Sequence, residues 1–408
     1  MGAGDRPDRL DHRPAGGGRR CRGGLLCAAP VLPHPRRADD RRRLLGVVAL
    51  APPAAVALNK GSLPVSVRLI ATEEAWQIPE VAAQLAETCK GPSQSLDKLL
   101  VSGIYEAVGG GAEYAGVDFL TGLLDIEGER LPQMDALGID MHLLSLTAPG
   151  VQMFDADTAT DLAALANDRL AEICHGRPDR FAGLASFAPQ SPRRAAREME
   201  RAITELKLNG FILNSHTNDE YLDDPKFWPC LEAAEALGAC IYIHPRAPSL
   251  TLKGPLADYG MDSAMWGYGV EVGTHAVRMM AGGVFDRFPN LKICIGHMGE
   301  AIGFWLWRIN FMNTRSQKAG RAPRTQRSIA EYFKDNFVIT TSGVEDPLAL
   351  RYSIDKLGVE NVMWAIDYPY QPMEPAVQFI REAPLSEAER QAVTHGNAER
   401  IFKIAPRG

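Results

Sequence analysis

The chain contains no C-x-x-C motif, although seven cysteines are spread over its 408 residues. Their scatter argues against a disulfide framework and against a zinc site built from cysteine. Cys240 and Cys294 lie inside apolar, strand-like runs, so we expect both to be small buried hydrophobic residues. The cysteines are therefore expected to pack rather than to react.

Long runs of basic residues and a dinucleotide-binding glycine motif are also missing from the main body of the chain. The formal net charge is −6 and no long basic stretch occurs there, which argues against nucleic acid or a membrane surface as the principal partner. No G-x-G-x-x-G motif follows the first predicted strand, so a dinucleotide-binding fold loses its main support. With 46% hydrophobic residues, the chain can still form one large core or two smaller ones.

The first 66 residues differ in composition from the rest. Residues 1–43 are rich in Arg, Gly and Pro without periodicity, so no fold is expected there. Arg41-Arg42-Arg43, an apolar run too short to span a bilayer, and Ala55-Val56-Ala57 then resemble a twin-arginine export signal at 41–57. That signal would place the protein in the periplasm. The alternatives are a disordered tail or an over-extended start of a cytoplasmic protein, and the cytoplasm is our expectation. We divide the chain into an extension, 1–66, and one domain, 67–408.

From residue 68 onward, short apolar runs alternate with helical patterns. The first run ends at Glu73, and the long segment 77–129 behind it is interpreted as an inserted lid. Eight strands alternating with helices predict an α/β fold of the (β/α)8 barrel type rather than an open doubly wound sheet. The strands are expected at 68–73, 142–147, 181–188, 210–215, 240–244, 291–297, 337–342 and 362–367.

Apolar residues at helical spacing predict the helices between these strands. The segment 123–137 ends before Gly138, which suits a helix C-terminus. The Ala- and Leu-rich segment 157–175 has Asp157 or Thr158 as its N-cap. Further helices are expected at 192–206, 227–237, 274–281, 301–313, 348–357, 374–380 and 387–402.

Carboxylates and imidazoles stand at the ends of five predicted strands. These ends converge on one face of a (β/α)8 barrel. A single histidine there would more often be a packing residue, but acids placed together repel and resist burial, and a divalent cation removes that cost. The constellation therefore predicts a metal site. Its members are Glu73, His216, His244, His297 and Asp367.

Several segments carry a resemblance to a known family. Ala71 to Ala75, Tyr242 to Pro245, Gly296 to Glu300 and Asp367 to Pro369 resemble the decarboxylase branch of the amidohydrolase superfamily. Asn214 to Thr217, Gly267 to Glu271 and Asp367 to Gln371 are most similar to the 5-carboxyvanillate decarboxylases, and the chain also resembles the gamma-resorcylate and 2,3-dihydroxybenzoate decarboxylases. The resemblance spans about 68 to 404. It implies an amidohydrolase-type barrel and non-oxidative decarboxylation of a hydroxylated aromatic acid.

The resemblance further implies that Glu73, His244 and Asp367 bind one divalent metal ion. Many members of the superfamily carry H-x-H at the first strand, where this chain has Glu73-Glu74-Ala75, and Ala75 cannot bind a metal. Asn214 stands where binuclear hydrolases carry a bridging lysine or acid. Both differences favour a mononuclear site, for which two carboxylates and one imidazole suit Mn²⁺, with Zn²⁺ as the alternative. Glu74 has no assigned role.

The chemistry implied by this branch centres on Asp367. The substrate carboxylate and an ortho phenolate would chelate the metal, and Asp367 would protonate the carboxyl-bearing ring carbon. His297 and Glu300, expected to meet across one helical turn, are assigned to hold and tune that proton; Glu300 could instead be a solvated residue favoured by the helix dipole. A metal-dependent hydrolase, such as a lactonase or amidase on the same barrel, is the alternative activity.

Three further side chains are candidates to contact the substrate. His216 would touch it or cap the next helix, and Arg246, which follows His244-Pro245, suits a carboxylate. Tyr370 would meet a second polar group; it and Arg246 could otherwise be ordinary surface residues. The 5-carboxyvanillate decarboxylases supply a lid arginine, but 77–129 contains none, so the particular aromatic acid stays open. The family also implies a homodimer or homotetramer, with contacts through Phe304, Trp305 and Trp307.

Overall fold

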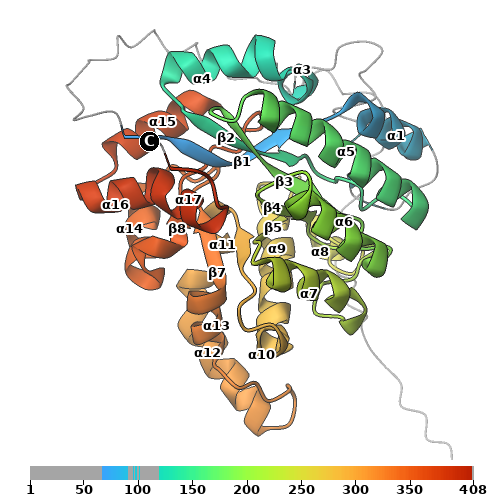
Figure 1. Ribbon diagram of the computed structural model, residues 1–408. Coiled ribbons are helices and arrows are strands. Elements are labelled where there is room, and N and C mark those ends of the chain that lie inside the picture. Colours follow the sequence, from blue (N-terminus) through green and yellow to red (C-terminus); the bar gives the residue numbers. More distant parts are fainter. Residues whose placement is uncertain (1–66, 91–94, 96, 99–100, 102–118, 407–408) are drawn as a thin grey trace, which may run out of the picture. The chain divides into compact units, whose positions relative to one another are not determined.

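The computed structural model describes residues 67–90, 95, 97–98, 101 and 119–406. These residues belong to one compact unit that spans 63–408. Its centre is an eight-stranded parallel sheet whose strands follow their order in the sequence, and helices surround it (Figure 1). The predicted (β/α)8 barrel is therefore confirmed. The predicted extension 1–66 and its signal-like segment 41–57 lie outside the described residues, as do residues 91–94, 96, 99–100 and 102–118 of the lid.

The strands are short and buried on both faces, as parallel strands covered by helices require. Every residue in them is buried, which accounts for their near-continuous apolar runs. The strands are β1 (Ile70–Trp76), β2 (Met141–Leu146), β3 (Phe181–Ser186), β4 (Gly210–Asn214), β5 (Ile241–His244), β6 (Ile293–Ile295), β7 (Phe337–Thr340) and β8 (Val362–Met363).

Helices follow the strands in turn and form the outer layer (Figure 1). The α-helices are α1 (Pro79–Lys90), α3 (Phe119–Leu124), α4 (Leu131–Leu137), α5 (Ala156–Gly176), α6 (Pro192–Thr204), α7 (Trp228–Leu237), α8 (Lys253–Leu256), α9 (Gly267–Ala281), α10 (Val284–Arg287), α11 (His297–Glu300), α12 (Ile302–Lys318), α13 (Ile329–Asn336), α14 (Pro347–Leu357), α15 (Met373–Glu382), α16 (Glu387–Gln391) and α17 (Asn397–Ile401). Short 3₁₀ or π segments are η2 (Ile126–Arg130), η3 (Pro225–Phe227), η4 (Val359–Asn361) and η5 (Ala392–Gly396).

Local side-chain and backbone chemistry fixes where several helices begin and end. Asp155 is the N-cap of α5 and accepts the backbone N–H groups of Asp157 and Thr158 at 3.0 and 3.1 Å. The prediction that Asp157 or Thr158 is the cap was therefore wrong, because both are first-turn donors. Gly138 ends α4 as predicted, at φ 68°, a left-handed conformation that glycine adopts without steric cost.

Several predicted elements differ from the observed ones. β1 continues to Trp76 beyond its predicted end at Glu73, and α9 begins at Gly267 rather than at residue 274. The helix predicted over 123–137 is divided at Asp125, whose side chain accepts the Gly128 N–H at 2.6 Å and starts a new turn. The helix predicted over 387–402 is interrupted by η5. The strand predicted over 362–367 pairs with β7 only at Val362–Met363, so the residues that follow it are held by other contacts.

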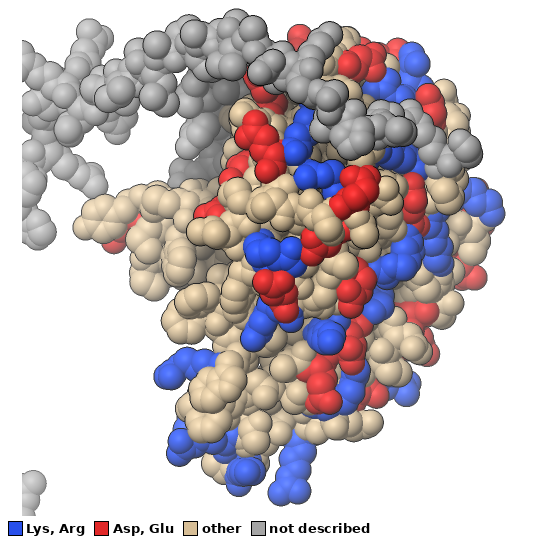
Figure 2. Space-filling model, turned by 90° about the vertical axis from the view of Figure 1, so that its left-hand side faces the viewer, with Lys and Arg blue, Asp and Glu red and all other residues tan. Residues whose placement is uncertain are grey.

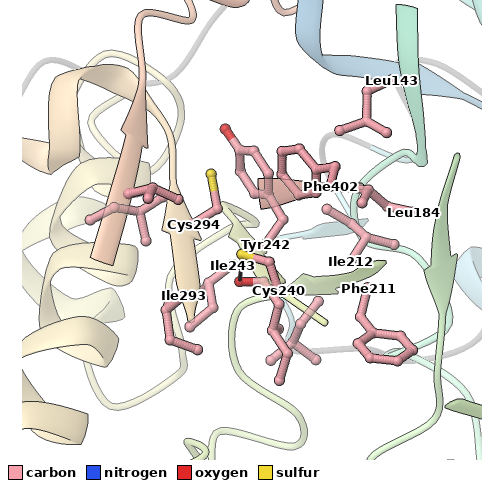
Figure 3. Close-up of a cluster of buried hydrophobic side chains, with 14 of the residues drawn as sticks. Leu143, Leu184, Phe211, Ile212, Cys240, Tyr242, Ile243, Ile293, Cys294 and Phe402 are labelled. Carbon is pink, nitrogen blue, oxygen red and sulfur yellow. Dashed lines mark hydrogen bonds between the residues drawn. The ribbon is translucent and has the colours of Figure 1, made fainter. Parts of the chain in front are cut away.

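Apolar side chains from neighbouring strands form a buried cluster on both faces of the sheet, because successive strand residues point to opposite faces. Figure 3 shows Phe211 and Ile212 of β4, Tyr242 of β5 and Cys294 of β6 among them. Cys240 and Cys294 are buried, as predicted, and burial raises the pKa of the Cys240 thiol to about 12. Tyr242 differs from its neighbours because its hydroxyl is hydrogen-bonded to polar groups at the carboxyl ends of the strands.

The seam between β1 and β8 is not a regular ladder. Each strand from β1 to β7 pairs with its successor, but the described residues contain no β8–β1 pairing. Single hydrogen bonds cross this seam instead: the Thr72 hydroxyl donates to Trp364 O and the Ala75 N–H to Tyr368 O, both at 2.8 Å. The conformation of the chain after β8 therefore depends on individual groups of β1.

The outer surface carries both charged and aromatic side chains. Figure 2 shows a face on which Lys and Arg are interspersed with Asp and Glu over much of its area. On α12, Phe304, Trp305 and Trp307 are 69%, 53% and 71% exposed, so they do not belong to the core, and their predicted role in a subunit contact stays a prediction. Of the helices described, none has the length and apolar character needed to cross a membrane.

Candidate active site

Three side chains from distant parts of the sequence meet at one end of the barrel. Glu73 lies in β1, His244 ends β5, and Asp367 follows β8. Each offers one possible ligand atom, and these atoms lie within 4.8 Å of one another. Glu73 and His244 are buried, whereas Asp367 is partly exposed. The structure thus assembles the predicted metal site from the strand ends, with one side open to an incoming molecule.

The two carboxylate oxygens of Glu73 have different surroundings. Oε2 accepts hydrogen bonds from the hydroxyls of Tyr242 and Ser342, and from that of Thr340 at 2.9 Å. Oε1 is buried and has no hydrogen-bond partner. Leaving a buried carboxylate oxygen without a partner is costly, and a cation at this position would remove that cost. Three hydroxyls therefore orient Glu73 and leave Oε1 for a metal ion.

His244 presents the nitrogen that a metal requires. Its Nδ1 lies 2.7 Å from the Pro245 carbonyl oxygen, and because a carbonyl only accepts, Nδ1 carries the proton. Nε2 is then the lone-pair nitrogen, and it lies 3.5 Å from Oε1 of Glu73. Burial lowers the pKa of His244, which favours the neutral form that binds metals. The donor set of two carboxylates and a neutral imidazole fits one divalent ion.

The pKa values of Glu73 and Asp367 are shifted in opposite directions. Burial opposes ionisation of Glu73, but His297, His244 and the hydroxyl hydrogen bonds outweigh it and lower the pKa of this carboxyl. Burial and the neighbouring Glu73 raise the pKa of Asp367 well above its usual range. Burial beside Glu73 thus favours the protonated form of Asp367, whereas a bound divalent cation would act on this carboxyl in the opposite direction.

Glycines make room for two of the carboxylates. A Cβ on Gly296 would lie 2.6 Å from Oε2 and 2.9 Å from Oε1 of Glu73. A Cβ on Gly269 would lie 2.9 Å from Oε2 of Glu300. These separations are too short for real contacts, so both positions favour glycine. The contact with Glu300 explains the glycine at position 269, near the start of α9.

His297 and Glu300 form the predicted pair, but the backbone conformation that brings them together differs from the predicted one. Nδ1 of His297 lies 2.8 Å from Oε1 of Glu300. The residues of α11 and the following Ala301 all have positive φ, between 49° and 74°, so the turn is left-handed. The prediction of an ordinary helical turn was wrong, although the spacing was right. Burial alone would lower the pKa of His297, but Glu300, Glu73 and Asp367 together raise it to about 10.

A cavity of about 850 Å³ opens beside this pair. Its lining includes His297, Glu300, Asp367 and Tyr268, and α12 contributes Trp305 and Arg308. Arg308 is exposed. Sequence reasoning missed this arginine, although positions 305, 308, 309 and 312 fall at helical spacing and all four line the cavity.

The three residues predicted to bind substrate have other partners. His216 uses both ring nitrogens on the backbone, since Nδ1 accepts the Asp219 N–H at 3.3 Å and Nε2 lies 3.1 Å from Ala247 O. Arg246 is 3% exposed and paired with buried Asp97. The Tyr370 hydroxyl lies 2.6 Å from that of Thr147. Their contact with substrate stays a prediction.

A second buried cluster contains a serine, a histidine and a glutamate, as a catalytic triad does, but its hydrogen bonds run in the opposite direction. Nε2 of His275 accepts the Leu222 N–H at 3.0 Å, so Nδ1 carries the proton and donates to Ser215 Oγ at 3.3 Å. Ser215 in turn donates to Glu271 at 3.1 Å. A nucleophilic serine needs a histidine that accepts its proton. This cluster therefore has a structural role.

Comparisons with known proteins agree with this geometry. Residues 122–404 match the amidohydrolase family. A crystal structure of 5-carboxyvanillate decarboxylase from Sphingomonas paucimobilis is 57% identical, with a TM-score of 0.81 over 83% of this chain and 100% of that chain. The 5-carboxyvanillate decarboxylase of Novosphingobium aromaticivorans, complexed with manganese and 4-hydroxy-3-methoxy-5-nitrobenzoic acid, is 35% identical, with a TM-score of 0.79 over 83% and 96% of the two chains. Gamma-resorcylate decarboxylase of a Polaromonas species is 36% identical over 291 residues, which are 69% of this chain and 89% of that protein.

Proposed function

We propose that the protein is a metal-dependent carboxy-lyase. The chain belongs to the amidohydrolase family and, within it, to the branch of aromatic acid decarboxylases. Its reaction would be the non-oxidative decarboxylation of a hydroxylated aromatic carboxylic acid. The observation that carries this proposal is the partnerless Oε1 of Glu73, which lies next to His244 and to an Asp367 that lines the cavity.

Glu73, His244 and Asp367 would hold the ion. Two carboxylates and one imidazole suit Mn²⁺, with Zn²⁺ as the alternative, and manganese is present in the Novosphingobium relative. When bound, the cation would fix the substrate through its carboxylate and ortho hydroxyl oxygens and neutralise charge on them. Asn214, whose Nδ2 lies 3.5 Å from Leu146 O, has a neutral amide that cannot bridge two metal ions as a carboxylate does, which supports a mononuclear site.

Asp367 would supply the proton for the reaction. It would deliver its carboxyl proton to the ring carbon that bears the carboxylate, which interrupts aromaticity. The bond between that carbon and the carboxylate would then break, its electron pair would return to the ring, and carbon dioxide would leave. Asp367 ends the cycle as a carboxylate and takes up a proton again. Its place in the cavity lining, beside Glu73 and His244, supports the role of proton donor.

His297 and Glu300 would set the position and charge of the groups around Asp367. The 2.8 Å contact between them fixes the imidazole, and Nε2 of His297 lies 3.8 Å from Oε1 of Glu73. A cationic imidazole here would favour the negative charge left on Asp367 after proton transfer. Both side chains therefore act on the proton rather than on the leaving carboxylate.

Arg308 would select the substrate. Its guanidinium belongs to the cavity wall, and guanidinium binds carboxylates well. An aromatic acid with a second carboxylate, as in 5-carboxyvanillate, would therefore bind better than a monocarboxylate such as 2,6-dihydroxybenzoate. Arg308 would then take the part of the lid arginine that residues 77–129 lack.

The experiment is to load the protein with Mn²⁺ and incubate it with both acids while carbon dioxide is measured. We expect carbon dioxide release, and we expect Asp367→Asn to lower kcat by about 10² to 10⁴-fold while the circular dichroism spectrum is unchanged. Retained turnover in this variant would refute the proton-donor role. Inert aromatic acids together with hydrolysis of lactones or amides would replace the decarboxylase by a hydrolase.

A further inference from the structure

Glu74 follows a metal-site carboxylate in sequence but faces away from the metal site. Its side chain is completely buried. Oε1 accepts the backbone N–H of Ile366 at 3.0 Å, and Oε2 accepts that of Tyr368 at 3.1 Å. These two donors flank Asp367. One carboxylate thus holds the chain immediately before and immediately after the residue proposed to donate the proton.

Asp367 requires such support because its backbone is strained. Its φ is 81°, a region that is unfavourable for a residue with a side chain and persists only where the surroundings impose it. The Asp367 N–H donates to Glu73 O at 3.1 Å. Three consecutive N–H groups, 366–368, are therefore all bound by Glu73 or Glu74.

Strand pairing does not provide these contacts. β8 ends at Met363, before the three donors, and the β1–β2 ladder shifts register between Ala71 and Glu74. In a regular parallel pair, backbone carbonyls would accept the N–H groups. Here the acceptor for two of the three is a side chain, so a single substitution can remove it.

The surroundings of Glu74 keep it out of contact with substrate. Nδ1 of His142 lies 3.9 Å from Oε2, and both side chains have no exposed surface. Buried Arg130 donates to Gly122 O at 3.1 Å and lies 4.6 Å from the centre of the Tyr368 ring. A side chain enclosed in this way acts on the reaction only through the backbone that it binds.

We propose that Glu74 is the positioning residue for Asp367: its carboxylate fixes the direction in which Asp367 presents its carboxyl group to Glu73 and His244. The inference rests on the proposed function, in which Asp367 is both metal ligand and proton donor. It also explains the pair of acids in β1. Because successive strand residues point to opposite faces, Glu73 enters the metal site and Glu74 enters the seam.

The test is Glu74→Gln in the full-length protein. The amide keeps one acceptor oxygen but turns an NH₂ group toward the second backbone N–H, so one flanking hydrogen bond is lost without a change of shape. We expect the Mn²⁺ dissociation constant to rise about ten- to hundredfold, and kcat at saturating Mn²⁺ to fall by a similar factor. The dissociation constant is measured from the electron paramagnetic resonance of free Mn²⁺, and the spectrum of the bound ion reports its geometry.

Thr72→Val is the matched control. It removes another hydrogen bond across the same seam, the one from the Thr72 hydroxyl to Trp364 O at 2.8 Å, but leaves both N–H groups beside Asp367 bound. We expect it to lower the melting temperature as Glu74→Gln does, while the Mn²⁺ dissociation constant and kcat stay within about twofold of the wild type. Glu74→Asp keeps both oxygens on a shorter arm and should recover part of the Mn²⁺ affinity.

Each outcome decides for or against this role. Equal effects of Glu74→Gln and Thr72→Val on Mn²⁺ binding would overturn the proposal, because Glu74 would then support the barrel in general. Failure of both Glu74 variants to give folded protein would overturn it for the same reason. A wild type that binds Mn²⁺ but releases no carbon dioxide would refute the proposed function alone, since the Mn²⁺ measurements would still test Glu74.

Discussion

Oε1 of Glu73 lies 3.5 Å from Nε2 of His244, and the other polar atom of each side chain is already bound. Oε2 of Glu73 accepts from three hydroxyls, and Nδ1 of His244 donates to the Pro245 carbonyl. Hydrogen bonds thus hold one polar atom of each side chain. The other polar atom of each, Oε1 of Glu73 and Nε2 of His244, faces its neighbour. Hydrogen bonds hold both ligand atoms in place, which is the arrangement that favours tight and selective metal binding.

The room left beside Glu73 can be tested with Gly296→Ala. The new Cβ would lie 2.6 Å from Oε2 and would push the carboxylate away from its hydroxyl partners. We expect Mn²⁺ affinity to fall at least about tenfold, as measured by calorimetric titration. Gly176→Ala is the control, because a Cβ there meets nothing within 4 Å. Unchanged affinity in Gly296→Ala would show that Glu73 does not bind the ion.

Removal of the metal should destabilise the protein and not only inactivate it. Two carboxylates and two imidazoles stand close together in the site, and the ion offsets the cost of burying them. At a hundredfold excess of Mn²⁺ over its dissociation constant, binding adds about 2.7 kcal/mol of stability. We expect chelation to lower the melting temperature and Mn²⁺ to restore it. The same Mn²⁺ response in Glu73→Gln would contradict the assignment of Glu73 as ligand.

Arg308 should affect one class of substrate only. In Arg308→Ala, an aromatic acid with a second carboxylate loses a charged hydrogen bond worth about 1.5–3 kcal/mol, so its kcat/KM should fall by about ten- to hundredfold. A monocarboxylic hydroxybenzoate should be nearly unaffected. Arg315→Ala on the same helix is the control, since that exposed residue does not line the cavity. An equal fall in kcat/KM with both substrates would mean that Arg308 does not bind the second carboxylate.

The pair of Asp97 and Arg246 should matter for stability rather than for catalysis. Both are buried, so Asp97→Ala leaves an unpaired buried guanidinium and should cost about 3–5 kcal/mol in urea unfolding. Glu87→Gln, which breaks the exposed pair with Lys90, should leave the urea midpoint nearly unchanged because solvent screens that pair.

The pH dependence of this pair follows from the sign of the shift. Burial opposes ionisation of Asp97, but Arg246 outweighs it and lowers the pKa below its ordinary value of 3.8. The stabilisation is therefore complete above that value and is lost as the pH falls through the folded pKa. Equal stabilities of the wild type and Asp97→Ala at neutral pH would contradict this account.

The metal ligands could be predicted although only His244 ends its strand, since Glu73 lies inside β1 and Asp367 follows the end of β8 at Met363. Parallel strands bring Glu73, His244 and Asp367 to one face whatever joins them. Tyr242 shares a strand face with His244 at a spacing of two residues, so its role behind Glu73 was in principle open to the same reasoning.

Other contacts depend on features that a single sequence does not display. The pairing of Asp97 with Arg246 joins residues 149 apart in sequence, and neither belongs to a periodic pattern that would bring them together. The left-handed turn of α11 has the same residue spacing as a right-handed one, so spacing alone could not reveal its hand. Glu74 could not be assigned because its partners are backbone N–H groups, which every residue except proline carries.

The left-handed turn also separates α12 from the His297–Glu300 pair in conformation. A helix lengthens or frays by extending its own conformation one residue at a time, but α12 begins at Ile302, directly after residues of opposite hand. Extension past that point would require each residue to change the sign of φ. We therefore expect disturbances of the exposed aromatic helix α12, including contact with another protein, to stop at Ile302 and leave the His297–Glu300 pair in place.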